Sequence, residues 1–359
     1  MPSYTLDEVR VRACRERDSW WTVWAVDPLA IRLVRLVANR TSITPNQLTV
    51  AVLLLGLGAA ACFAVGLWPF LIAGAVLYYL CFLADCMDGK LARLTSRESL
   101  FGSWMDYVFD RFRVLVCAIA LMGGQYVLTG RIVFVWLALA VVFCDMLRYL
   151  NALQVYKVRR EMRSRLAAVL EWARATLSML ESDEKDEKRA AGQPLSDLGE
   201  QAVLRHGISV LEDLLRSQTE KENSADWEAG KQPDVRLPRV DLHQGFRTRF
   251  PWYQKFWDFL RRRRIRTHLV SGIEFQAAVF VVAPLAAVFS ATAVVWITVA
   301  AGVLLLVFEI LIVYKLWLST LDFFRVVDGI ENALRDTRPP GEKTTDQIPD
   351  ESPSQATLR

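Results

Sequence analysis

Long runs of apolar residues without charge restrict the fold of this chain more than any other feature. Leu48 to Leu67 is free of charge over 20 residues, about the ~20 that an α-helix needs to cross a bilayer. Phe275 to Phe308 is free of charge over 34 residues, and Ser290 near its middle predicts a tight turn between two spans. The other apolar runs are Pro69–Ala84, Val114–Gly130 and Ile132–Cys144, which stays mostly apolar to about Leu153. The sequence therefore predicts an all-α integral membrane protein with six transmembrane helices.

Basic residues are distributed unequally around these spans. The expected outer loops are 68–69, 123–131 and 289–292, and of the 43 Lys and Arg residues only Arg131 lies in them. Because Lys and Arg favour the cytoplasmic side of a membrane, we expect both termini and the charged segments to be cytoplasmic. The chain has 34 Arg against 9 Lys, which is typical of a GC-rich bacterial genome, so we expect a bacterial plasma membrane.

Polar segments divide the chain into five parts. Residues 1–47 contain a charged helix and then, from Asp27-Pro28, an amphipathic helix expected to lie in the membrane interface. Residues 158–266 form a polar, helical cytoplasmic insertion between spans four and five. The tail, residues 319–359, is rich in Pro, Thr, Asp and Ser from about Asp336, which predicts partial disorder. The spans themselves occupy residues 48–157 and 267–318.

Four aspartates flank the predicted turn between the second and third spans. Asp85 and Asp88 are three residues apart at the end of one helix, and Asp106 and Asp110 are four apart near the start of the next, so each pair shares a helix face. Carboxylates this close disfavour each other's ionisation unless cations compensate them. Hard divalent ions prefer oxygen ligands, and Mg²⁺ combines a few carboxylates with substrate phosphates. The segment therefore predicts a site for Mg²⁺ or Mn²⁺, and two ions bridging a diphosphate would stabilise both the attacking and leaving oxygens.

Small and basic residues surround these aspartates. Arg93 is placed to meet phosphate oxygens with its planar guanidinium group. Gly89, Ala92 and Gly102 lack bulk, which allows backbone or a flat ring to approach closely. Together these residues indicate a pocket for a nucleotide diphosphate.

The whole pattern, D-x2-D-G-x2-A-R-x8-G-x3-D-x3-D, resembles the signature of the CDP-alcohol phosphotransferases, with all eight positions filled. Residues 44–49, TPNQLT, also resemble the T-P-N-x-x-T segment that often opens the first span of that family. The resemblance covers roughly residues 28–157 and 267–318. It implies six transmembrane helices, an N-terminal interfacial helix, a cytoplasmic active site and a homodimer.

The resemblance also implies roles for the motif residues. Asp85, Asp88 and Asp106 would hold the first metal ion, and Asp110 would act as general base on the acceptor hydroxyl and also touch a second ion. Gly89, Ala92 and Arg93 would line the cytidine diphosphate pocket, with Gly102 beside it. The implied reaction is attack by an alcohol on the lipid-side phosphorus of CDP-diacylglycerol, with release of CMP. Membrane lipids are further expected partners, and nucleic acid is not.

Several alternatives remain at this point. The acceptor is open among inositol phosphate, glycerol phosphate, serine and phosphatidylglycerol, and the basic cytoplasmic mouth favours a phosphorylated polyol. A CDP-choline or CDP-ethanolamine enzyme acting on diacylglycerol belongs to the same reaction class. A membrane scaffold that binds partners through residues 158–266, an ion pathway and a structural calcium site belong to other classes. Asp145 and Arg148 are expected to pair with each other or face the acceptor, and His268 and Glu274 to open span five near the same cavity.

Overall fold

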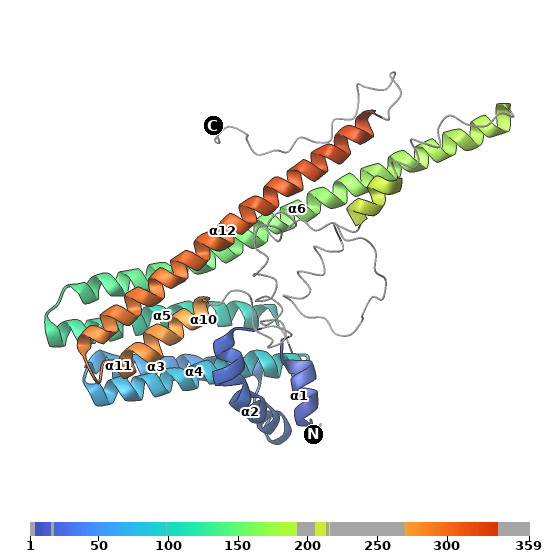
Figure 1. The fold of residues 1–359 in the computed structure, drawn as a ribbon. Coiled ribbons are helices and arrows are strands. Elements are labelled where there is room, and N and C mark those ends of the chain that lie inside the picture. Colours follow the sequence, from blue (N-terminus) through green and yellow to red (C-terminus); the bar gives the residue numbers. More distant parts are fainter. Residues whose placement is uncertain are drawn as a thin grey trace. The chain divides into compact units, whose positions relative to one another are not determined.

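The computed structural model describes residues 4–15, 18–97, 99–191, 205–212, 215 and 270–336. Regular structure in these residues is helical (Figure 1), as the sequence predicts. The helices are α1 (Leu6–Ala13), α2 (Asp27–Arg40), α3 (Pro45–Val65), α4 (Trp68–Thr95), α5 (Leu100–Thr129), α6 (Val133–Ala191), α10 (Gly272–Ala277), α11 (Ala283–Ala286) and α12 (Ala291–Asp336). Two π-helical turns, Thr22–Val26 and Ala278–Val282, join α2 and α11 to the segments before them.

Five described helices are long and apolar enough to cross a membrane: α3, α4, α5, α6 and α12. The segment expected as the fifth of six spans, Gly272–Ala286, is shorter. At about 1.5 Å per residue it reaches roughly 22 Å, less than the ~30 Å hydrocarbon core. It contains a π-helical turn, in which the Ala283 amide donates to the Ala278 carbonyl just before Pro284. The integral membrane class is therefore supported, whereas a sixth full span is not.

Local sequence signals explain where the helices near the aspartates begin and end. Thr44 and Gln47 form a reciprocal capping box at the start of α3, and Pro45 follows at the first helical position. Ser99 caps α5 by accepting from the Gly102 amide at 2.9 Å. Gly66, with φ of 73°, ends α3 in the left-handed region that glycine tolerates best. Residues 44–49 thus form a helix start, whatever their further role.

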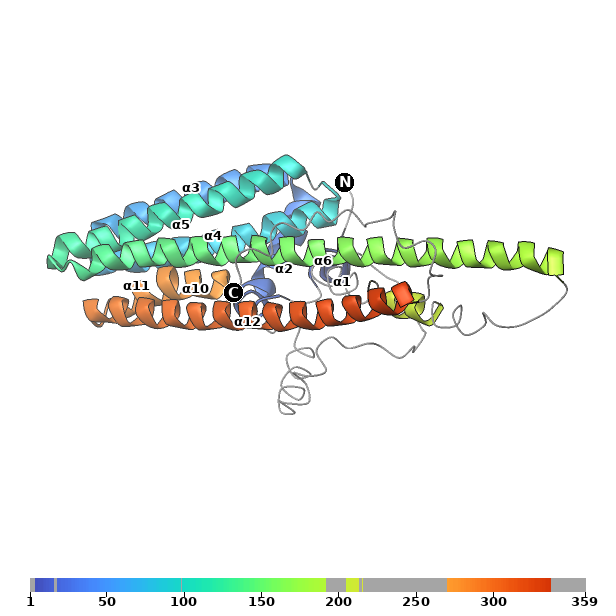
Figure 2. The same cartoon turned by 90° about the horizontal axis from the view of Figure 1, so that it is seen from above.

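Two compact units make up the chain. The first contains the described parts of Met1–Lys157 and His243–Leu316, and in it α3, α4 and α5 run side by side (Figures 1 and 2). Its core joins apolar side chains from α3 to α6 with those of the Gly272–Ala286 segment. Fully buried members are Phe63, Tyr78, Leu121, Phe134 and Phe280.

The two N-terminal helices pack on the second half of α4. Val9 and Ala13 of α1 and Ile31 of α2 bury themselves with Met87 of α4. α2 begins at Asp27, as predicted. Lys90 Nζ lies 2.8 Å from Asp27 Oδ1 in an ion pair, and both side chains are buried. These contacts fix α2 beside the segment that carries the aspartates.

The second unit contains the described parts of Val158–Glu220 and Trp317–Arg359. Leu166 and Leu170 of α6 pack here with Leu211 of the 205–212 helix and Phe323 of α12. α12 remains helical to Asp336, so much of the segment expected as a tail is helix. The aromatic and arginine-rich stretch 250–266 and the residues after Asp336 lie outside the described residues.

α3 and α5 approach each other closely at Gly124. A Cβ at this position would meet the Phe63 carbonyl oxygen and lie 2.9 Å from the Ala64 carbonyl oxygen, whereas a Cβ at Gly123 would meet nothing within 4 Å. We predict that Gly124→Ala lowers the free energy of unfolding by about 1–3 kcal/mol, because backbone must move apart. Gly123→Ala should leave it unchanged or raise it by up to about 1 kcal/mol. Thermal unfolding in detergent measures both, and equal effects would show that the helices do not touch at Gly124.

Candidate active site

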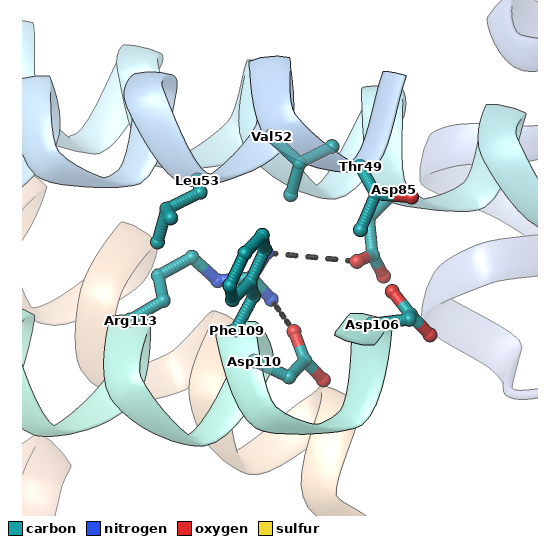
Figure 3. A pocket seen from close by; sticks show the side chains of 8 residues that line it. All are labelled: Thr49, Val52, Leu53, Asp85, Asp106, Phe109, Asp110 and Arg113. Atoms are coloured by element: carbon teal, nitrogen blue, oxygen red, sulfur yellow. Dashed lines mark hydrogen bonds and ion pairs between the residues drawn. The ribbon is translucent and has the colours of Figure 1, made fainter. Parts of the chain in front are cut away.

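Three of the four motif aspartates line one small pocket between α3, α4 and α5. Figure 3 shows the carboxylates of Asp85, Asp106 and Asp110 directed toward the same space, from two helices. The remaining lining residues are Thr49, Val52, Leu53, Phe109 and Arg113. Residues three or four apart lie on the same face of a helix, and a short turn joins α4 to α5. The spacing of the aspartates therefore brings their carboxylates together.

Arg113 bridges two of these carboxylates. One terminal nitrogen, Nη1, lies 3.5 Å from Asp85 Oδ1, and the other, Nη2, donates to Asp110 Oδ1. The Arg113 side chain is only 2% exposed. Its Cζ lies 5.7 Å from the centre of the Tyr78 ring, and Nη1 is 3.2 Å from the Cys81 sulfur. A buried guanidinium group therefore neutralises part of the carboxylate charge from within the protein.

Arg111 forms the second cationic contact of Asp110. Its Nη2 lies 3.1 Å from Asp110 Oδ2, and its Nη1 donates to Asp145 Oδ2 on α6. Its Cζ lies 3.3 Å from the centre of the Tyr149 ring, a cation–π arrangement. Both oxygens of Asp110 are therefore in contact with arginine.

The network closes on itself through α10. Gln276 donates to Asp145 Oδ1 at 3.0 Å and accepts from the Tyr78 hydroxyl at 3.3 Å. Because Tyr78 also lies beside Arg113, the polar contacts run from α4 through α5, α6 and α10 and return to α4. Buried polar groups connected in this way restrain one another's orientation.

Asp88 occupies a different environment from Asp110. It is buried, and its Oδ2 accepts from the Thr49 hydroxyl at 3.0 Å. Neither Asp88 nor Asp106 has an ion-pair partner in the part of the chain that the structure describes. Two carboxylates of the motif therefore make no ion pair with another described residue.

The residues expected to hold the nucleotide divide into two groups. Arg93 Nε donates to the Ala13 carbonyl at the end of α1 at 2.8 Å. A Cβ on Gly89 would lie 3.5 Å from Arg93 Nη1, so these two residues are close, and Ala92 is half-buried on the same helix. Gly102 lies in the first turn of α5, where a Cβ would meet Asn46 Oδ1 at 2.8 Å. Gly102 thus allows α5 to begin against the start of α3.

The motif residues offer carboxylate and hydroxyl oxygens, which are the ligand atoms that a hard divalent cation prefers. Among the described residues, however, no three His, Cys, Asp or Glu side chains already converge as a ligand set. Arg113 contacts one oxygen of Asp85 and one oxygen of Asp110. The oxygens that remain available for a cation are those of Asp88, Asp106 and the second oxygen of Asp85.

The structure shows the ion-pair partners of Asp145 and Arg148. They do not pair with each other: Asp145 contacts Arg111, whereas Arg148 Nε lies 2.9 Å from Glu309 Oε1 on α12. Glu309 also accepts from Asn151. Glu274 accepts from Ser271 at the start of α10 in a capping box, and His268 lies outside the described residues.

Comparison with known proteins adds an independent line of information. Residues 42–182, which contain every motif aspartate, match the family model for CDP-alcohol phosphatidyltransferase. The resemblance in the motif is thereby confirmed, over a match that runs through α3, α4 and α5 and most of α6.

Two named relatives are similar over shorter stretches. The chain is 41% identical over 71 residues to a "Bifunctional IPC transferase and DIPP synthase" of Aquifex aeolicus, which is 19% of this chain and 15% of the relative. It is 41% identical over 84 residues to a protein of the same name from Thermococcus kodakarensis, which is 23% and 18% of the two chains. The chain therefore matches less than a fifth of the length of each of these relatives.

Proposed function

We propose that this protein is a divalent-metal-dependent phosphatidyltransferase that moves a phosphatidyl group from CDP-diacylglycerol to an alcohol and releases CMP. The observation that carries the proposal is the convergence of Asp85, Asp106 and Asp110 on one pocket within the matched CDP-alcohol domain. The pocket lies between membrane-crossing helices, where a donor with two acyl chains would be held. We place the site and both termini on the cytoplasmic side, because basic residues are concentrated there.

The chain's own residues supply distinct parts of this chemistry. Asp88, held by Thr49, together with Asp106 and Asp85 would bind a Mg²⁺ or Mn²⁺ ion, which neutralises diphosphate charge when bound. Arg93, with Gly89 and Ala92, would line the nucleotide pocket. Asp110 would take the proton of the acceptor hydroxyl as that oxygen forms its bond to the lipid-side phosphorus and the bond to CMP breaks. Arg111 and Arg113 contact the two oxygens of Asp110 and fix its orientation.

We further propose a phosphorylated polyol as acceptor, inositol phosphate or glycerol phosphate being examples. Arg111 and Arg148 lie on α5 and α6 near the motif, and each carries guanidinium nitrogens of the kind that bind phosphate. The protein is proposed to work as a homodimer in the bacterial plasma membrane.

A CMP-release assay tests the proposal. Purified protein in detergent or nanodiscs is given CDP-diacylglycerol and a panel of alcohols, with Mg²⁺, with Mn²⁺, or with EDTA. We predict CMP and a new phospholipid in equal amounts with either metal, and loss of both with EDTA. Products from CDP-choline and diacylglycerol instead would support the alternative reaction within the family. No CMP from either donor at any metal concentration would contradict the proposal and favour a scaffold.

A further inference from the structure

The last turn of α1 contacts a residue of the proposed nucleotide pocket. Arg93 Nε donates to the Ala13 carbonyl at 2.8 Å. Ala13 is the last residue of α1, and the backbone is extended at Cys14 after it. The last carbonyls of a helix have no partner within the helix and carry partial negative charge, so a guanidinium group is favoured there. The contact therefore joins the end of α1 to Arg93 on α4.

α1 has a defined position on its neighbours. Val9 and Ala13 are four residues apart, which places them on one face of the helix, and both are fully buried in a cluster with Met87 of α4. At the start of α1, Asn39 of α2 accepts from the Tyr4 amide at 2.9 Å and donates to the Tyr4 carbonyl at 3.0 Å. The helix is thus fixed at its start by α2 and along its buried face by α4.

The contact with Ala13 restrains the direction of the Arg93 side chain. Arg93 is half-buried. A Cβ on Gly89 would lie 3.5 Å from Arg93 Nη1 and 3.9 Å from Nη2, so both terminal nitrogens lie over Gly89. A guanidinium group binds phosphate through paired nitrogens in one plane, so the binding depends on how that plane is held. The carbonyl at the end of α1 therefore holds Arg93 on the glycine face of α4.

The segment after α1 leads toward the aspartates. Arg15 is exposed, two residues beyond the end of α1, and lies near enough to Asp106 on α5 to act on its charge. The N-terminal segment thus lies beside both the expected nucleotide pocket and the carboxylates. α1 precedes the matched residues 42–182, so its role follows from these contacts and not from the family match.

We propose that α1 is a positioning element of the donor site: its Ala13 carbonyl holds the Arg93 guanidinium group over Gly89, where the group binds the diphosphate of a CDP-linked donor. This inference rests on the proposed function and extends the site beyond the matched residues to the N-terminal helix. Ala13 does not touch the donor but acts through Arg93. A helix that leaves α4 frees Arg93 to rotate, which lowers the affinity for the diphosphate.

Equilibrium dialysis of cytidine 5′-diphosphate against the full-length protein in nanodiscs, with Mg²⁺ and without acceptor, tests the effect on binding. Val9→Asn places a polar group in the contact between α1 and α4 without adding charge. It should weaken binding at least about tenfold, as expected when a hydrogen bond to a charged group is lost. Val11→Asn is the matched control, because Val11 is 73% exposed on the same helix, and should bind within about twofold of the wild type.

A doubly substituted protein separates positioning from general destabilisation. If α1 acts through Arg93, Val9→Asn should weaken binding by less than about twofold in a protein that already carries Arg93→Met. An equal tenfold loss in both backgrounds would show that α1 acts by another route and would overturn the inference. Wild-type affinity in Val9→Asn would overturn it as well.

Hydrogen exchange of the α1 amides gives a readout that needs no ligand. We expect the amides of residues 9–14 to exchange at least about tenfold faster in Arg93→Met than in the wild type, because the helix loses the contact at its last carbonyl. Normal binding of cytidine 5′-diphosphate with unchanged exchange would contradict the inference alone. Faster exchange in a protein whose wild type binds no cytidine 5′-diphosphate would instead contradict the proposed function, together with the donor named here.

Discussion

Asp110→Asn should lower the rate of CMP release from CDP-diacylglycerol by about 10²–10⁴-fold, the range typical for loss of a general base. The amide has nearly the same shape as the carboxylate but does not accept the acceptor's proton. Rates are measured at saturating CDP-diacylglycerol and metal, so that the effect appears in kcat. The substitution also weakens the contacts with Arg111 and Arg113, so thermal unfolding of the same preparation is followed in parallel.

Asp322→Asn is the matched control for this experiment. Asp322 lies on α12 in an exposed pair with Arg325 at 3.6 Å, outside the candidate site. Its rate should stay within about twofold of the wild-type rate, as expected for a surface pair that contributes little. A folded Asp110→Asn protein that released CMP at the wild-type rate would show that another group, or solvent, takes the proton.

Arg113→Met should lower the free energy of unfolding by about 3–5 kcal/mol, the usual cost of removing one partner from a buried ion pair. Methionine fills much of the same volume, so the loss reports on charge more than on packing. Asp85 and Asp110 are then left with fewer cationic partners in a mostly buried setting, their side chains being 29% and 19% exposed. Thermal or denaturant unfolding in one detergent, without added metal, measures the effect.

Arg325→Met provides the comparison for this stability measurement. The Arg325 side chain is 81% exposed, and its loss should change the free energy of unfolding by no more than about 1 kcal/mol. Added Mn²⁺ should stabilise both proteins, because an ion bound by the folded state raises the free energy of unfolding, and the gain should be larger in Arg113→Met. Equal effects of the two substitutions would mean that Arg113 is not an essential counter-charge inside the protein.

The sequence predicts the carboxylate half of the site well because helical geometry fixes it. Asp85 and Asp106 lie near a short turn between two helices, so a spacing of three or four residues is enough to direct them to one pocket. The start of α3 follows from the capping box of Thr44, and the start of α2 at Asp27 is marked by Pro28 in its first turn. These features depend only on neighbours in the sequence.

The arginine half of the site was missed, because its partners are distant in the sequence. The apolar run in the sequence begins at Val114, which places Arg111 and Arg113 outside the predicted span, whereas α5 runs unbroken from Leu100 to Thr129. A charged residue inside a membrane-crossing helix is itself a functional signal, and that signal would have identified Arg113. Its contact with Asp85, and the contact of Gln276 with Asp145, depend on how α4, α5, α6 and α10 pack.

The sixth predicted membrane span is not confirmed, for a related reason. Hydropathy counts apolar residues but does not register that a π-helical turn and Pro284 interrupt the segment Gly272–Ala286. Asp145 and Arg148 are three residues apart, which favours an ion pair between them. Instead, Asp145 pairs with Arg111 on α5, and Arg148 pairs with Glu309 on α12. Helix packing therefore decides the pairing of charges inside the membrane unit.

Phosphorus-31 electron–nuclear double resonance on the Mn²⁺-loaded protein with CDP-diacylglycerol tests the central claim most directly. If the aspartates hold a cation that binds the donor's diphosphate, the Mn²⁺ signal should show a phosphorus coupling in the wild type and lose it in Asp106→Asn. A bound Mn²⁺ ion without any phosphorus coupling, under conditions in which CMP is released, would contradict the account.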